Sequence, residues 1–295
     1  MTFDPVYGAY FGPVVVGGDS HTSLQLAAGD SGGNGGMSNG YLGGTVSVLA
    51  GTGAGQYRRI VTPPEFGSSS STVNSSEDSG TGAGTGTGTA PDLTVEIERP
   101  FTTPLDSTSL IQVGPFKGRF IFHNNRYEDG GGFQTYGNAH DVIISKHKFA
   151  RTENLVSWGR GNGPSVYSPN LRIQFLDNTI EEGNHLWNWN ATYPYPHPKT
   201  IEPYSMGVLG SDQDPQPCMP YPHGNKGPCP APTTARFQGS INHHIIFRRN
   251  AIENNGGVVV RGHTQNVIVE GTVITNSSVG IHVNGTFAYH VLVVP

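Results

Sequence analysis

The chain has 295 residues with a net charge of −5, only 13% charged residues, 42 glycines and 22 prolines. This composition argues against a helical bundle and favours many short strands joined by turns. Because no basic run of five residues occurs and no apolar stretch approaches the roughly 18 residues that cross a bilayer, the sequence argues against a nucleic-acid partner and a membrane span.

Two early β-rich segments, Thr45-VSVLAG and Leu93-TVEIERP, flank a stretch of very low complexity. Residues 66–90 are almost entirely Gly, Ser and Thr, and their last part reads GTGAGTGTGT. Such a composition cannot bury enough apolar surface to order itself. We expect residues 66–90 to be a flexible surface loop between two strands.

Five segments further along the chain align without gaps: Phe120-IFHNNRYED, Val142-IISKHKFAR, Ile173-QFLDNTIEE, Ile245-IFRRNAIEN and Val267-IVEGTVITN. Each segment opens with an alternating β-rich run. The sixth residue is polar in every segment, and the five are Asn125, His147, Asn178, Asn250 and Thr272. The eighth residue is apolar, and the five are Tyr127, Phe149, Ile180, Ile252 and Ile274.

The first two segments start 22 residues apart, and so do the last two. This period, with strands of four to six residues, is typical of a β-solenoid, in which each coil buries its apolar side chains against neighbouring coils. A turn Asn can bond its amide to the Asn above and below, so the sixth residues are expected to form a structural ladder in which His147 and Thr272 are substitutes.

Wider separations between the middle segments place insertions at roughly 159–168 and 190–240. The Thr45 and Leu93 segments then count as earlier coils, with the low-complexity loop inserted between them. Residues 1–295 are therefore predicted to form one domain.

A third set of strands starts four residues after most of these segments: Phe133-QTYG, Leu155-VSWG, Leu186-WNWN, Val258-VVRG and, one residue later, Ile281-HVNG. Because strand side chains alternate, the fourth residues are expected to point outward in one column, namely Tyr136, Trp158, Trp189, Arg261 and Asn284. The outward second residues are Gln134, Val156, Trp187, Val259 and His282.

Aromatic rings repeated at the coil spacing of ~4.8 Å are suited to stacking on sugar rings, with Arg261 and His263 available for an acidic group. The predicted substrate-binding residues are Gln134, Trp158, Trp187, Trp189, His282 and Asn284. The alternative is that the 190–240 insertion packs on these rings and covers them.

The 190–240 insertion is rich in Pro and Tyr and contains both cysteines of the chain. Cys218 and Cys229 bracket a short Pro/Gly loop that suits a local disulfide, the alternative being two free thiols. Four glycosylation sequons begin at Asn74, Asn190, Asn276 and Asn284. These features favour a secreted, extracellular glycoprotein whose signal peptide lies outside this sequence.

The pattern hxhxxNxhxxxxxxGhxh over residues 116–290 resembles the right-handed parallel β-helix superfamily of pectate lyases, alginate-modifying enzymes and phage tailspikes. The stretch GTGAGQYRRIV…RPFTTPLDSTS…FHNNRYEDGGGFQTYG is similar to secreted bacterial and algal β-helix repeat proteins of uncertain activity. The resemblance implies an all-β, single-stranded, right-handed parallel β-helix with long loop insertions. It does not transfer a reaction, because this fold hosts lyases, hydrolases, epimerases and non-catalytic fibres.

The reactions known on this fold need particular residues. Calcium-dependent lyases need clustered carboxylates, and inverting glycosidases need two carboxyls roughly 6.5–9.5 Å apart, yet the outward positions contain no Asp or Glu. The signature of alginate epimerases is also absent, since Asp214-Pro215 is followed by Gln216. His243 and His244 are adjacent, so in a regular strand they would face opposite sides and could not bind one metal. No metal or other cofactor is predicted.

Metal-free β-elimination stays open, in which a base removes the proton alpha to a uronate carboxylate while a cation neutralises the growing charge. The candidate bases are Tyr136, His263 and His282, and the candidate neutralising groups are Arg160 and Arg261. Whether the chain is an enzyme is left undecided by the sequence.

Two functions are therefore open. The first is a secreted β-helix that binds an acidic polysaccharide along the Tyr136–Arg261 column and could cleave it by β-elimination. The second is a non-catalytic extracellular structural or adhesive glycoprotein. In favour of the second, the sequence stops at Val294-Pro295 inside an expected coil strand, which predicts a longer parent chain or a stacking partner at that end.

Overall fold

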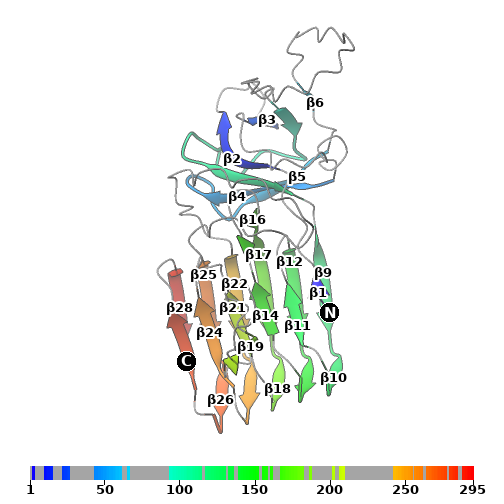
Figure 1. The fold of residues 1–295 in the computed structure, drawn as a ribbon, viewed down its shortest axis with the longest axis vertical. Helices are drawn as coiled ribbons and strands as arrows, with labels where there is room; N and C mark the ends of the chain where they lie inside the picture. The colour runs from blue at the N-terminus through cyan, green and yellow to red at the C-terminus, as the bar shows by residue number, and fades with distance from the viewer. Residues whose placement is uncertain are drawn as a thin grey trace, which may run out of the picture.

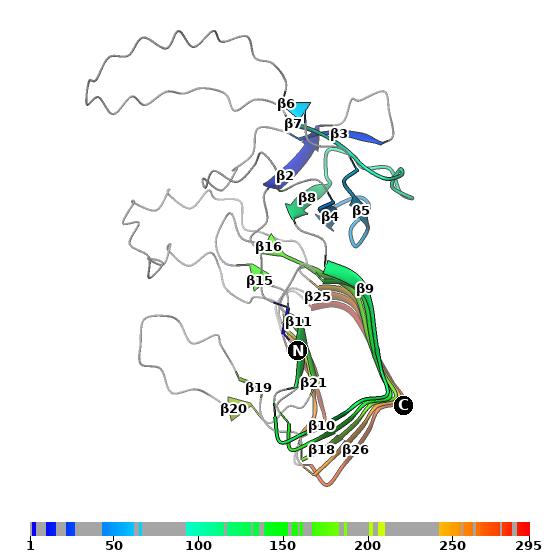
Figure 2. The ribbon, with the colours of Figure 1, turned by 90° about the vertical axis from the view of Figure 1, so that its right-hand side faces the viewer.

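The computed structural model describes residues 2–3, 10–15, 22–26, 43–61, 65–66, 93–114, 117–130, 132–135, 139–152, 155–158, 160–161, 167–182, 186–187, 201–202, 206–209, 242–254, 256–261, 264–277, 279–284 and 288–295. Strands are the only regular secondary structure in these ranges, so the all-β prediction is confirmed. The strands form three parallel sheets, one antiparallel sheet and two short hairpins (Figures 1 and 2).

The first part of the chain folds into a seven-stranded antiparallel sheet in the order β5-β4-β8-β2-β3-β7-β6. The strands are β2 (Tyr10–Val15), β3 (Ser23–Leu26), β4 (Thr45–Ala50), β5 (Tyr57–Arg59), β6 (Glu65–Phe66), β7 (Leu93–Glu96) and β8 (Leu110–Gly114). Val46, Val48, Ile111 and Val113 are fully buried in its own core.

The prediction that the Thr45 and Leu93 segments are early coils of the repeat is therefore wrong. β4 pairs antiparallel with β5 and β8, and β7 pairs antiparallel with β3 and β6. An alternating pattern specifies a strand with one buried face, but it does not specify the direction of the neighbouring strands.

The remaining strands build three parallel sheets. The first parallel sheet contains β9 (Lys117–His123), β12 (Ala139–Ser145), β17 (Asn170–Leu176), β22 (Asn242–Arg248), β25 (Thr264–Glu270) and β28 (Ala288–Val294). The second contains β10 (Arg126–Glu128), β13 (Lys148–Ala150), β18 (Thr179–Glu181), β23 (Ala251–Glu253) and β26 (Val273–Thr275). The third contains β1 (Thr2–Phe3), β11 (Phe133–Thr135), β14 (Leu155–Trp158), β21 (Met206–Leu209), β24 (Val258–Arg261) and β27 (Ile281–Asn284).

From β9 to β28 the described strands visit the three parallel sheets in rotation, with the two hairpins between them. Figure 2 looks along the strand stacking, with the first parallel sheet on the right, the third on the left and the second at the bottom. The five aligned segments pair in the predicted register, for example Phe120 with Val142 and Val142 with Ile173. The predicted eighth residues also pair in sequence, from Tyr127 to Ile274.

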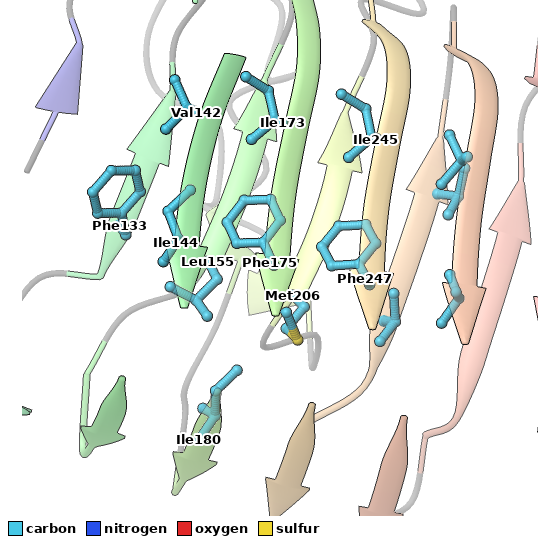
Figure 3. Packing of buried hydrophobic residues seen from close by; sticks show 14 of the residues in the cluster. Phe133, Val142, Ile144, Leu155, Ile173, Phe175, Ile180, Met206, Ile245 and Phe247 are labelled. Atoms are coloured by element: carbon cyan, nitrogen blue, oxygen red, sulfur yellow. The ribbon is translucent and has the colours of Figure 1, made fainter. Parts of the chain in front are cut away.

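Apolar side chains from all three parallel sheets share one core. Val142 comes from the first sheet, Phe149 from the second and Phe133 from the third, and all three are buried. Phe175 and Phe247 stack with ring centroids 5.0 Å apart and an interplanar angle of 7° (Figure 3). Stacking of successive layers, perpendicular to the strands, therefore supplies the burial that no single layer could achieve.

Residues with left-handed backbone conformation recur at three places in each round of the chain. One row comprises Arg119, Asp141, Arg172, His244, Asn266 and His290, a second Asn124, Lys146, Asp177, Arg249 and Gly271, and a third Asp129, Arg151, Glu182, Asn254 and Asn276. In the second and third rows the backbone N–H donates to a carbonyl of the next layer, as Asn124 does to Ser145 at 3.0 Å. These bonds offset the cost of a positive φ at residues other than glycine.

Leu186–Trp187, the described part of the predicted Leu186–Asn190 strand, does not join the third parallel sheet. β19 (Leu186–Trp187) pairs antiparallel with β20 (Ile201–Glu202), and β21 occupies the place between β14 and β24 instead. The Met206–Leu209 strand inside the predicted insertion was missed because Met-Gly-Val-Leu has a weaker alternating pattern than Leu-Trp-Asn-Trp. The other hairpin, β15 (Arg160–Gly161) with β16 (Tyr167–Ser168), lies within the predicted 159–168 insertion.

Candidate functional site

Four of the predicted ladder residues form a continuous hydrogen-bonded row. The Asn125 N–H donates to His147 Nδ1 at 2.9 Å, and the His147 N–H donates to Asn178 Oδ1 at 3.0 Å. The Asn178 N–H and Nδ2 both donate to Asn250 Oδ1, at 3.0 and 3.1 Å. Asn178 and Asn250 are each 1% exposed, so the row stabilises the corner between the first and second sheets, and its buried part is closed to a ligand.

A second buried polar row lies at the start of the first parallel sheet and was not predicted. Asn170 Nδ2 donates to Asn242 Oδ1 at 3.2 Å, and the Ser157 hydroxyl donates to the same oxygen at 3.2 Å. Asn170, Asn242 and Ser157 are fully buried. The equal register of Asn170 and Asn242, 72 residues apart, was the available sequence signal.

Three residues of the predicted outward column share one backbone register row. Trp158, Leu209, Arg261 and Asn284 occupy one register row at the ends of β14, β21, β24 and β27. Leu209 therefore takes the place that was predicted for Trp189. Tyr136, Trp189 and His263 lie outside the described residues.

The other predicted site residues are scattered. Arg160 pairs with Ser168 in the β15–β16 hairpin, so its backbone is not in the sheet that carries Arg261. The second-position row runs through Gln134, Val156, Gly207, Val259 and His282, and Gly207 replaces the predicted Trp187. In this row His282 is exposed, whereas Val259 is only 2% exposed.

The predicted disulfide and most predicted glycosylation sites cannot be placed. Cys218, Cys229, Asn74 and Asn190 lie outside the described residues. Asn284 ends β27, and Asn276 is exposed at the turn after β26. The Nδ2 of Asn276 donates to Asn254 Oδ1 at 2.7 Å.

Several ionisable groups come together where the antiparallel sheet meets the first parallel sheet. Tyr57 of β5 is 3% exposed, and its hydroxyl donates a short hydrogen bond to the Asp141 carboxylate of β12. Arg172 of β17 donates to both oxygens of Asp141, and its guanidinium lies 4.7 Å from the Tyr57 ring centroid. This Tyr–Asp–Arg triad clamps the two sheets together.

Three histidines surround the triad. His140 is fully buried with its ring centroid 4.6 Å from that of Tyr57, and His243 is fully buried with Nε2 3.2 Å from the Leu49 carbonyl oxygen. The His243 and His244 ring centroids are 6.3 Å apart. The expectation that these two rings face opposite sides is wrong, because the left-handed φ of 57° at His244 interrupts the strand alternation.

The loop before Tyr57 is held over these histidines by a second loop. Gln56 Oε1 accepts the Thr102 N–H at 2.9 Å, and the Thr52 hydroxyl donates to Asp106 at 2.6 Å. A side chain at Gly55 would place its Cβ 2.7 Å from the His244 ring, so the close approach requires glycine. The GTGAGQYRRIV and RPFTTPLDSTS motifs are thus two halves of one hydrogen-bonded loop pair.

Burial and charge shift the ionisation of the groups at this junction. Burial lowers the pKa of His140 to about 3, so this histidine is neutral near neutral pH. Burial alone would raise the pKa of Asp141, but the hydrogen bonds from Arg172 and Tyr57 outweigh it and lower that pKa. Burial and the bond to Asp141 raise the pKa of Tyr57, which disfavours this tyrosine as a base.

The described part of the chain contains no group of three or more His, Cys, Asp or Glu residues that could hold a metal ion. No helix among the described residues is long and apolar enough to cross a membrane. No protein-family model matches the sequence, and no curated protein matches it.

Proposed function

We propose that the three parallel sheets are the faces of a right-handed parallel β-helix of the pectate-lyase-like kind. The rotation of the chain through the sheets supports this, and so does the shared core to which all three contribute. The Asn row at one corner also supports it, because a ladder of this kind requires the same turn to recur in register.

The proposed function is binding of an extended acidic polysaccharide by a secreted protein. The observation that carries it is the register row Trp158–Leu209–Arg261–Asn284, which repeats one residue per strand along the third parallel sheet. A polymer lying across the strands would meet a new side chain at each interval of about 4.8 Å. An arginine in this row suits a uronate or sulfate group.

Cleavage by β-elimination would need a positive charge at the uronate carboxylate, and Arg261 is the residue proposed to supply it. Of the candidate bases, His282 lies one strand away from Arg261, because Val259 pairs with His282 and Arg261 with Asn284. Its exposure leaves the imidazole open to solvent and to a ligand.

Affinity electrophoresis in gels containing alginate, pectin or ulvan-type polymers tests binding. We expect retardation by at least one polymer, and we expect the Arg261→Ala variant to lose it. Arg126→Ala is the matched control, because Arg126 is exposed in β10 of another sheet. Ultraviolet absorbance of an unsaturated product tests elimination separately. Equal mobility in all gels would remove the binding function, and retardation without product would leave a binding protein.

A structural or adhesive function is the second candidate. The outward row of the first parallel sheet is mainly aliphatic and runs through Ile121, Ile143, Gln174, Ile246, Ile268 and Leu292. Ile121 is 71% and Leu292 53% exposed, which suits apolar contact with another surface. Concentration-dependent sedimentation that is lost in Ile121→Lys would support assembly.

A further inference from the structure

Three histidines and an ion pair lie at a junction where the antiparallel sheet rests on the first parallel sheet. His140, His243 and His244 come from β12 and β22, and the β4–β5 hairpin covers them through Tyr57, Leu49 and Gly55. Clustered histidines under a docked element are the usual basis of acid-sensitive contacts. We propose that this junction is an acid-sensitive switch, in which protonation of the buried histidines releases the β4–β5 hairpin from the first parallel sheet.

The geometry makes His140 the main sensor. Its side chain is 0% exposed and lies against the Tyr57 ring, so an imidazolium could be hydrated only after the hairpin moves away. The charged groups facing it are Asp141 on its own strand, which favours the proton, and Arg172 on β17, which opposes it. Because Arg172 and Asp141 already pair with each other, their effects on a new charge at His140 largely cancel. Burial is therefore the main reason that protonation of His140 is unfavourable in the closed junction.

The other groups at the junction act in the same direction or titrate elsewhere. Desolvation and the positive charge of Arg172 both lower the pKa of His244, although this residue is exposed. Arg58 on β5 adds a further positive charge that is already partly desolvated. The pKa of Asp141 is lowered from its usual value of 3.8, so this carboxylate stays charged between pH 6.5 and 4.5.

The stability of the closed junction depends on pH because His140 binds its proton less tightly when it is buried. The pKa of His140 falls from 6.5 to about 3 on folding, so the closed junction is fully stable above pH 6.5 and weakens as the pH falls towards 3. Within that window one such group multiplies the opening equilibrium by about 10 for each pH unit. Between pH 6.5 and 4.5 the expected increase is therefore about 50-fold, because the exposed imidazole is already half protonated at pH 6.5.

Hydrogen exchange measured by mass spectrometry on the full chain, corrected for the intrinsic rate at each pH, tests this proposal. The hairpin amides of Val48 and Gly55, which bond within the hairpin, should lose about 50-fold protection between pH 6.5 and 4.5. The β18 and β23 amides should keep theirs. His147, whose pKa is also lowered by burial, lies in the corner row, so its protonation would be read at β13 and not at the hairpin.

His140→Leu should abolish the pH response of the hairpin, because Leu171 already occupies the same register position in β17. His282→Leu is the matched control, since His282 is an exposed histidine in β27. If His140→Leu does not fold, His140→Gln serves in its place as an uncharged polar residue. Unchanged hairpin protection in the wild type, simultaneous loss of protection in β18 and β23, or an undiminished response in the variant would each overturn the proposal.

Discussion

Removing the Asn178 side chain should be among the most damaging single changes in the parallel sheets. Its amide makes three side-chain bonds: it donates to the Ile144 carbonyl and to Asn250 Oδ1, and it accepts the His147 N–H. Asn178→Ala leaves the His147 N–H and the Ile144 carbonyl without that partner inside the protein. At about 1–3 kcal/mol for each buried group, we expect unfolding to be easier by about 2–6 kcal/mol.

Asn125→Ala is the matched control, because Asn125 occupies the same row at its exposed end. Its side chain makes one hydrogen bond, to the His123 carbonyl, so its removal should cost less than about 1 kcal/mol. Guanidinium unfolding followed by circular dichroism measures both changes, and an unchanged slope shows that the midpoint shift reports stability. Similar losses in the two variants would refute the view that the buried part of the row carries the stabilisation.

Three further changes test other parts of the structure. Gly51→Ala should destabilise the loop pair by about 2–4 kcal/mol, because φ is +72° and the new Cβ would lie 1.9 Å from the Thr108 carbonyl oxygen; thermal unfolding measures this. Lys146→Gly should stabilise by about 0.5–1 kcal/mol, since Gly271 shows that this left-handed row accepts glycine; an unchanged or lower midpoint would contradict it. Asp141→Asn should cost about 1.5–3 kcal/mol at neutral pH. That difference should shrink as the pH falls below 3.8, because the lowered pKa of Asp141 contributes stability only while the carboxylate is charged.

The alignment of five segments predicted the strands, their stacking and the polar ladder from local sequence pattern alone. Alternation in Val142–Ser145 and its counterparts required a strand with one buried face, and the 22-residue spacing required equal strands to stack. The polar sixth residue could be assigned to a ladder because an amide both donates and accepts along a stack. Each of these inferences needed only the residues within one period.

The assignments that failed depended on which segments become neighbours. The Thr45 segment alternates as a coil strand does, yet it pairs antiparallel with β8. Leu186–Trp187 resembles the third strand of a coil better than Met206–Leu209 does, but the latter fills the sheet. Both sites are flanked by insertions, where a repeat can no longer be counted along the chain.

In the candidate site, too, contacts between adjacent repeats were predicted and contacts between distant segments were not. Sequence reasoning brought Arg261 and Asn284 into one row, because they lie in adjacent periods. It did not bring Tyr57 to Asp141, 84 residues away, or Leu49 to His243, 194 residues away. It also placed His243 and His244 on opposite faces, since only the folded backbone reveals the left-handed residue between regular strand positions.

By itself, the amino-acid sequence determined that this protein is built of short strands, that five of its segments stack in register and that an amide row lines one turn. Only the tertiary structure decided that the first 114 residues include a separate antiparallel sheet and that histidines, Tyr57 and an ion pair meet beneath it. The physical reason is that hydrophobic periodicity and turn chemistry act within one repeat, whereas docking between sheets depends on side-chain contacts across long separations in the chain.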